Sequence, residues 1–166
     1  MAQYATKPLL SFVALFTFTH LLQASENTIE GYWFSSGSII EIKVCEQLIC
    51  AEILALITEE EIDPLTVLDD NNTDRDLRER TLVGINLFDG FQKELLLNET
   101  LKGGRIYDPR RGRFYNAELT LLENDNLLVE GCLLFICDGE EWLPLEVTIN
   151  PDGSRQATLK SNSDQQ

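Results

Sequence analysis

Short segments in which apolar and polar residues alternate set the strongest limit on the fold of this chain. From Ser38 to Cys45, Ile40, Ile42 and Val44 fall on one face, and a similar segment runs from Cys50 to Ile57. A period of two places successive side chains on opposite faces of a β-strand, so one face of each strand is expected to be buried. The sequence therefore predicts an all-β protein.

Turn-forming residues separate these segments from several others that are rich in aliphatic and aromatic residues. Together with a first strand, the expected strands number about eight, and the further ones are Leu82–Phe88, Gln92–Leu97, Gly104–Tyr107, Phe114–Leu121, Asn126–Cys132 and Glu141–Thr148. One short helix, Asp74 to Arg80, is expected with Thr73 or Asp74 as its cap. A sandwich and a barrel both fit this pattern, and we favour an eight-stranded antiparallel barrel because closure removes exposed strand edges.

The beginning of the chain resembles a secretory signal peptide. Lys7 precedes the apolar run Leu9 to Leu22, and cleavage is expected after Ala24. We therefore predict a signal peptide over residues 1–24, a β-barrel domain over 25–149 and a flexible polar tail over 150–166. The expected location is the periplasm or the exterior, and the cleaved protein is not expected to span a membrane, because the run is shorter than a bilayer requires.

The four cysteines form two pairs of equal spacing, Cys45 with Cys50 and Cys132 with Cys137. Four cysteines allow three connectivities. Cys45 and Cys50 are expected to face each other across a hairpin, within reach of a disulfide, and Cys132 and Cys137 flank a similar turn. A four-thiolate metal site is the alternative, but its usual spacing is shorter and an exported protein meets an oxidising compartment.

The charge and the histidine content exclude several functions. The net charge of −15 argues against partners that are polyanions, such as nucleic acids. The single histidine, His20, lies in the predicted leader, so histidine-dependent catalysis and histidine metal ligands are not expected. We predict no catalytic residues, no metal and no cofactor. A carboxylate-dependent hydrolase using Glu140, Glu141 or Asp108 is a remote alternative.

A set of motifs from residue 29 to 145 resembles a bacterial envelope family, the domain of unknown function 2147. The resemblance is carried by Gly31-Tyr32-Trp33, the two cysteine pairs, Asp74 to Arg80, Gly90-Phe91, Gly104 to Gly112, Tyr115 and Trp142. It implies a calycin-like barrel, similar to lipocalins, that is exported from the cytoplasm.

The expected function follows from this resemblance: an exported, non-catalytic, lipocalin-like protein that binds a small apolar or amphipathic molecule inside its barrel. Tyr107 and Tyr115 either pack in the core or present hydroxyl groups to the cavity. The candidate ligand contacts are Trp33, Phe91, Tyr107 and Tyr115, and the candidate anion contacts are Arg105, Arg110 and Arg111. The alternative is an acidic envelope protein that binds or inhibits a basic protein such as a lysozyme.

Overall fold

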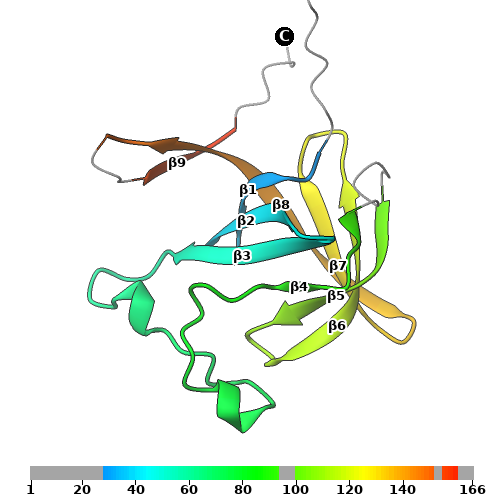
Figure 1. Cartoon of the computed structure of the whole chain (residues 1–166), viewed down its shortest axis with the longest axis horizontal. Helices are drawn as coiled ribbons and strands as arrows, with labels where there is room; N and C mark the ends of the chain where they lie inside the picture. The colour runs from blue at the N-terminus through cyan, green and yellow to red at the C-terminus, as the bar shows by residue number, and fades with distance from the viewer. Residues whose placement is uncertain (1–27, 94–99, 152–154, 161–166) are drawn as a thin grey trace, which may run out of the picture.

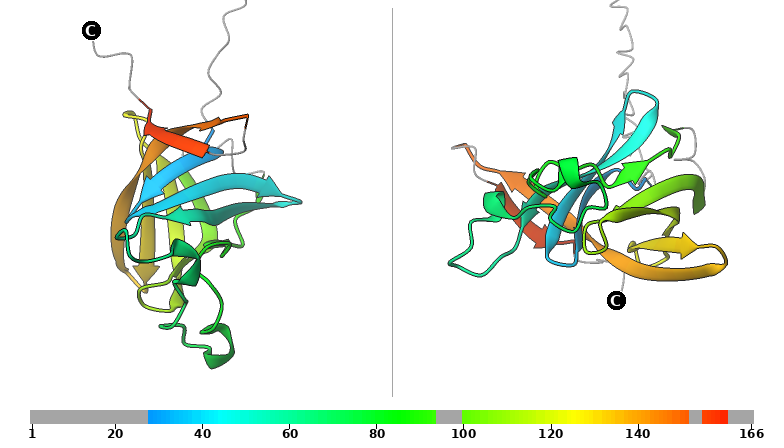
Figure 2. Two further views of the ribbon diagram at one scale, coloured as in Figure 1. Left: turned by 90° about the vertical axis from the view of Figure 1, so that its left-hand side faces the viewer. Right: turned by 90° about the horizontal axis from the view of Figure 1, so that it is seen from below.

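The computed structural model describes residues 28–93, 100–151 and 155–160, which form a β-barrel with a long loop extending beyond its strands (Figures 1 and 2). Nine strands make one sheet, in the order β3-β2-β1-β8-β7-β6-β5-β4, with β9 pairing with β8, and each of these strand pairs is antiparallel. The strands are β1 Gly31–Ser35, β2 Ser38–Cys45, β3 Leu48–Leu56, β4 Phe88–Asp89, β5 Thr100–Asp108, β6 Arg113–Leu121, β7 Leu127–Leu133, β8 Ile136–Ile149 and β9 Arg155–Leu159.

The barrel closes between β3 and the segment that contains β4. This segment is expected to be a regular strand from Leu82 to Phe88, but the structure forms only single bridges before Phe88. The amide of Leu87 donates to Ala51 and that of Ile49 donates to Phe91, at 2.6 and 2.9 Å. The side-chain oxygen of Asn86 also accepts from the amide of Ala51 at 2.7 Å, so a side chain replaces a backbone acceptor at the seam.

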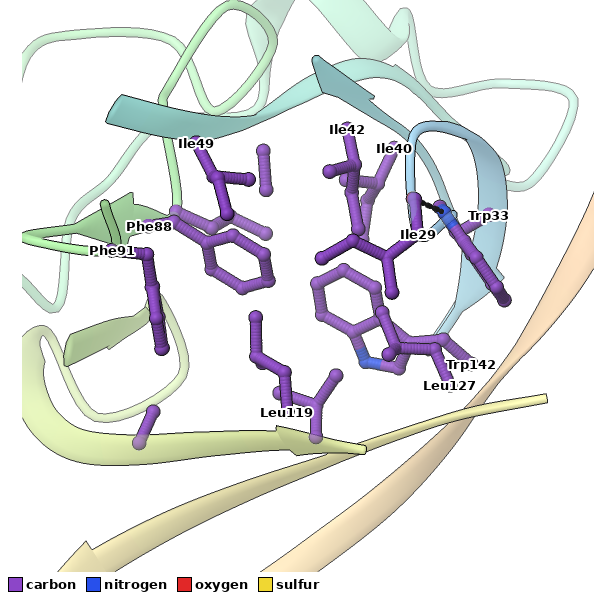
Figure 3. Close-up of a cluster of buried hydrophobic side chains, with 14 of the residues drawn as sticks. Ile29, Trp33, Ile40, Ile42, Ile49, Phe88, Phe91, Leu119, Leu127 and Trp142 are labelled. Atoms are coloured by element: carbon purple, nitrogen blue, oxygen red, sulfur yellow. Dashed lines mark hydrogen bonds between the residues drawn. The ribbon is translucent and has the colours of Figure 1, made fainter. Parts of the chain in front are cut away.

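The core occupies the interior of the barrel and follows the predicted alternation (Figure 3). Trp142 stacks on Phe88 with ring centroids 5.6 Å apart, and Phe88 meets Phe91 edge to face at 5.2 Å. The indole nitrogen of Trp33 donates to the carbonyl oxygen of Ile29 at 2.9 Å, so this buried polar atom has a partner. Burial of one face of each strand is the main stabilising contribution to such a barrel.

Both predicted disulfides are present, with a geometry that differs from the expectation for one of them. Cys132 and Cys137 are directly opposite each other in β7 and β8, with Cα atoms 4.0 Å apart. Cys50 is instead opposite Lys43, so its bond to Cys45 runs diagonally across the β2–β3 hairpin, over a Cα separation of 5.9 Å. The difference arises because Leu48 already belongs to β3, which shortens the turn to two residues.

Two other expectations differ from the structure. The predicted helix from Asp74 to Arg80 is only a 3-10 turn, Arg75–Leu77, capped by the side chain of Asp74; a second 3-10 turn spans Pro64–Thr66. The tail expected to be flexible from residue 150 contributes β9, which pairs with the end of β8. An edge strand needs only a partner backbone, so the weak apolar pattern of this segment does not prevent it from pairing. Most of the predicted strand Gln92–Leu97 lies outside the described residues.

Candidate ligand-binding site

A cavity of about 880 Å³ opens at one end of the barrel. This volume lies within the range of small-molecule binding sites, about 300–1,000 Å³. Its inner wall is formed by apolar side chains that point inward from six different strands or connecting segments: Ile40, Ile53, Leu87, Ile106, Val129 and Trp142. These side chains are available because alternate residues of each strand face the barrel interior.

The mouth of the cavity is charged and polar. The guanidinium groups of Arg110 and Arg111, in the β5–β6 turn, both bind the carboxylate of Asp108, at 3.2 and 2.7 Å. Arg110 also lies 3.8 Å from the carboxylate of Glu140 on β8, which accepts hydrogen bonds from Ser35 and Ser36 in the β1–β2 hairpin. The side chains of both arginines are more than half exposed, so they can exchange partners with a ligand.

The two arginines also control the ionisation of Asp108. Burial acts to raise the pKa of this carboxyl, but the hydrogen bonds from Arg111 and Arg110 outweigh it and hold the pKa below its ordinary value. Asp108 is therefore ionised at neutral pH and is not placed to act as a general acid. The mouth is therefore a network of paired opposite charges centred on Asp108.

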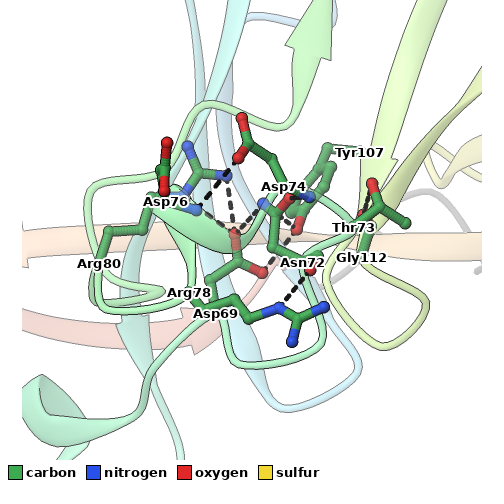
Figure 4. Close-up of polar contacts among 9 residues, drawn as sticks. All are labelled: Asp69, Asn72, Thr73, Asp74, Asp76, Arg78, Arg80, Tyr107 and Gly112. Atoms are coloured by element: carbon green, nitrogen blue, oxygen red, sulfur yellow. Dashed lines mark hydrogen bonds and ion pairs between the residues drawn. The ribbon is translucent and has the colours of Figure 1, made fainter.

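A buried polar network connects β5 to the long loop between β3 and β4 (Figure 4). The carboxylate of Asp69 accepts hydrogen bonds from the hydroxyl of Tyr107 at 2.6 Å, from the side-chain amide of Asn72 at 2.7 Å and from the guanidinium of Arg80 at 2.8 Å. The side chain of Asp69 is completely buried, whereas that of Arg80 is partly exposed. The network thus anchors this loop beside the cavity, which Val67 and Leu82 of the same loop help to line.

The β5–β6 turn is held against the same loop by close backbone packing. Thr73 donates both its amide and its hydroxyl hydrogen to the carbonyl oxygen of Gly112, at 2.9 and 3.0 Å. Gly112 has a φ of +63°, and a Cβ atom added there would lie 1.9 Å from the carbonyl oxygen of Asn71. Glycine is required here on both counts, and the contact fixes the position of the two arginines that precede it.

The buried tyrosine of this network provides a test at alkaline pH. Burial, together with the neighbouring Asp69 carboxylate, raises the pKa of Tyr107 to about 12. Folding therefore favours the neutral phenol, and this contribution is fully present below pH 10 and is lost as the pH rises toward 12. Between about pH 9 and about pH 11.5 we expect the stability advantage of the wild type over Tyr107→Phe to fall by roughly 1–2 kcal/mol, measured by urea unfolding. A constant difference across this range would contradict the expectation.

The structure separates the candidate ligand contacts into two groups. Tyr107 and Tyr115 line the cavity; the ring of Tyr107 is buried, while the hydroxyl of Tyr115 accepts a hydrogen bond from Arg113 at 2.7 Å. Trp33 and Phe91 are buried in the core and do not line it. Both rings pack among the other buried side chains of the barrel interior.

The candidate anion contacts separate in the same way. Arg110 and Arg111 lie at the mouth, as described above. Arg105 does not line the cavity: it pairs with Asp89 on the neighbouring β4 and stacks over the ring of Phe114 at 4.9 Å. Its position in β5 directs it to the outer surface of the barrel, where it closes a cross-strand ion pair.

The sequence does not predict the positions of several residues of the site. Asp69 and Asn72 are polar residues outside any predicted strand or helix, but they are buried, because the loop folds back onto Tyr107. The sequence suggests only a catalytic role for Glu140, whereas in the structure its carboxylate accepts hydrogen bonds from Ser35 and Ser36 and so joins the β1–β2 hairpin to the mouth. In both cases the decisive partner is more than 30 residues away in the chain, so no local pattern reveals it.

No group of three or more histidine, cysteine, aspartate or glutamate side chains in residues 28–93, 100–151 and 155–160 is arranged to hold a metal ion. Within those same ranges, no helix has the length and apolar character needed to cross a membrane.

The comparisons with known proteins agree with the barrel. No curated protein matches the sequence significantly. A solved structure from Helicobacter pylori, protein HP1028, described as belonging to the lipocalin family, superposes with a TM-score of 0.58 at 17% identity, over 70% of this chain and 82% of that one. At this identity the likeness concerns the fold alone. A family model described as an uncharacterized protein conserved in bacteria matches residues 31–143. The chain therefore belongs to the DUF2147 family, as its motifs indicate.

Proposed function

We propose that this protein is an exported, non-catalytic carrier that binds a small amphipathic molecule in the barrel. The observation that supports this best is the division of the cavity into an apolar inner wall and a charged mouth. An apolar chain would lie against Ile40, Ile53 and Val129, where it is removed from water. Its polar end would lie among the arginines of the β5–β6 turn and the carboxylate of Glu140.

The chemistry of the mouth favours an anionic head group, such as a carboxylate. Arg110 and Arg111 each have exposed donors, and a guanidinium can bind a carboxylate through two parallel hydrogen bonds. Export is supported by the predicted signal peptide and by the two disulfides, which form and persist in oxidising compartments. A non-catalytic role is supported by the engagement of Asp108 and Glu140 in ion pairs and hydrogen bonds.

Gly131 offers a direct test of cavity binding. It lines the cavity, and an added Cβ atom would make only an ordinary contact, 3.5 Å from the Cβ of Tyr115. We expect Gly131→Leu to remove the binding of a fluorescent long-chain fatty acid, because the larger side chain fills the opening. Gly131→Ala is the matched control and should bind like the wild type. Equal binding by all three proteins, or no binding by the wild type, would refute the proposal.

The head-group contact has its own test within the same assay. Arg110→Gln combined with Arg111→Gln is expected to weaken fatty-acid binding about tenfold, since a hydrogen bond to a charged group contributes about 1.5–3 kcal/mol and the site is partly exposed. Arg105→Gln, which removes a charge outside the cavity, is the control. Native extraction followed by mass spectrometry would identify the molecule that the protein carries.

The alternative is an acidic envelope protein that binds or inhibits a basic protein. The net charge of −15 supports it, as does the exposed run Glu59-Glu60-Glu61 in the long loop. Such binding should depend strongly on salt. Affinity for a basic lysozyme that falls steeply between low and high salt, and is unchanged in Gly131→Leu, would favour this alternative over the carrier.

A further inference from the structure

The hairpin that joins β7 to β8 ends in four consecutive large apolar residues, Leu133, Leu134, Phe135 and Ile136. We call these four residues the hairpin tip. Their exposed fractions are 59, 85, 88 and 69%. In Figure 1 this hairpin, coloured gold to orange, projects from the barrel. Single exposed apolar residues are common on soluble proteins, but a contiguous group marks a surface that meets another apolar phase.

The backbone conformation at Leu134 is one that leucine rarely adopts. Leu134 has a φ of 59°, in the left-handed region, where glycine and asparagine are favoured. The other described non-glycine residues with positive φ are Ser36, Glu46 and Asp125, all polar residues in turns. Leucine at position 134 is thus unfavourable both for its exposure and for its backbone conformation. The fold of the barrel does not explain a leucine at this position, so an interaction with another molecule is the remaining explanation.

The tip is held as a rigid, convex projection. The disulfide between Cys132 and Cys137 joins the two strands immediately beneath it, and these two residues are directly opposite each other. Leu133 pairs with Ile136, so the turn itself consists of only two residues. A convex tip of this size does not offer the broad complementary face that a folded partner would need.

The area and charge of the tip indicate what it meets. At about 150–200 Å² for a large side chain, the four residues expose on the order of 500 Å², which is less than the roughly 800 Å² that each partner contributes to a stable interface. A second copy of the chain bound through the tip alone is therefore disfavoured. The tip carries no charge, and the acidic residues Asp138 and Glu140 follow it, so attraction to an anionic surface is not its basis.

We propose that the hairpin tip inserts into the interfacial layer of a lipid bilayer and docks the protein there reversibly. A bilayer adapts its shape to a convex apolar projection, and the affinity comes from the apolar area that leaves water. Leu133 and Ile136 also line the barrel cavity, so docking would bring the cavity mouth to the lipid surface. The docking itself does not require that the cavity take a ligand, and it is tested separately.

The test is flotation of the exported protein, from which the predicted leader has been cleaved, with phosphatidylcholine vesicles, comparing the wild type with Leu134→Asn/Phe135→Ser. Asparagine tolerates the left-handed backbone at position 134, so the hairpin should keep its fold, which circular dichroism would verify. The matched control is Leu65→Ser/Leu159→Ser, which removes two leucines that are 62 and 60% exposed elsewhere on the surface. All three proteins are purified after export, without the predicted leader, so the apolar run Leu9–Leu22 cannot contribute to vesicle binding.

We expect the tip variant to lose at least about tenfold in vesicle partitioning, the control to match the wild type, and the wild-type binding to change little between about 0.15 and 0.5 M salt. In a separate Phe135→Trp variant, tryptophan emission should shift to the blue when vesicles are added, because Trp33 and Trp142 are already buried.

Three results would overturn the proposal. They are absence of wild-type flotation, equal flotation of the wild type and the tip variant, and wild-type self-association that the tip variant abolishes, which would identify a second copy as the occupant. Loss of fatty-acid binding in Gly131→Leu leaves this experiment unaffected, so failure of the carrier proposal and failure of membrane docking are distinguishable.

Discussion

Asp69→Ala is expected to lower the free energy of unfolding by about 3 kcal/mol. The substitution leaves the hydroxyl of Tyr107 and the amide of Asn72 without their buried acceptor and leaves Arg80 without its partner. Removing one partner of a buried ion pair costs about 3–5 kcal/mol, and the lower value applies because Arg80 is partly exposed. Urea unfolding followed by circular dichroism measures the change.

Asp70→Ala is the control for this prediction. Asp70 is the next residue in the chain and carries the same charge, but it is exposed, so a change below about 0.5 kcal/mol is expected. Asp69→Asn should fall between the two, because the amide keeps an acceptor for Tyr107 and loses the charge that Arg80 pairs with. Equal stability of the wild type and Asp69→Ala would show that the network does not anchor the loop.

Trp142→Ala is expected to destabilise the barrel by about 3–5 kcal/mol, the usual cost of truncating a large buried aromatic side chain. Trp142 is buried, stacks on Phe88 at a centroid distance of 5.6 Å, and forms part of the inner wall of the cavity (Figure 3). The truncation removes this apolar contact and enlarges a cavity that already exists, so the neighbouring side chains have little opportunity to fill the space. Thermal and urea unfolding both report the loss.

Phe135→Ala separates the effect of burial from that of simply removing an aromatic ring. Phe135 is 88% exposed at the hairpin tip, and its truncation should change stability by less than about 0.5 kcal/mol. Trp142→Phe should recover part of the loss, because a phenyl ring can still stack on Phe88. A cost below about 1 kcal/mol for Trp142→Ala would mean that this end of the barrel is not packed as described.

Local patterns predicted the regular part of the barrel. The alternation in β2 and β3 placed Ile40, Ile42, Ala51 and Ile53 on the buried face, and all four are buried. Val44 was predicted on the same face but is 37% exposed, because it lies beside the β2–β3 turn at the end of its strand. Alternation succeeds here because each of these strands buries one face only, so the period of the sequence matches the period of the backbone. The prediction of the two disulfides was correct for a related reason, because the two cysteines of each pair lie on one short hairpin.

The same reasoning failed where the chain departs from a regular strand. From Leu82 to Phe88 the composition is that of a strand, but the barrel closes there through single bridges and through the side chain of Asn86. At β9 the composition is that of a mobile tail, but backbone hydrogen bonds to β8 hold it. Pairing partners, rather than local propensity, decide both segments.

Some of the residues predicted to contact a ligand line the cavity and others do not. Arg110 and Arg111 lie at the cavity mouth, because a tight turn between two barrel strands places its residues at the rim. Trp33 and Phe91 have the right chemistry but are buried in the core and do not line the cavity. The depth of a side chain along the barrel axis depends on the stagger between strands, which sequence alone does not show.

The sequence by itself determined the membership of the DUF2147 family, the two disulfide pairs, the all-β class and the apolar faces of the regular strands. These properties depend on residues that are close together in the chain or that follow the period of a strand. Only the tertiary structure decided that Asp69 meets Tyr107, that Glu140 joins the mouth, and that the hairpin tip stands at the rim of the cavity. Those contacts join residues that are distant in the chain, and they form because β1 pairs with β8 and the long loop folds onto β5.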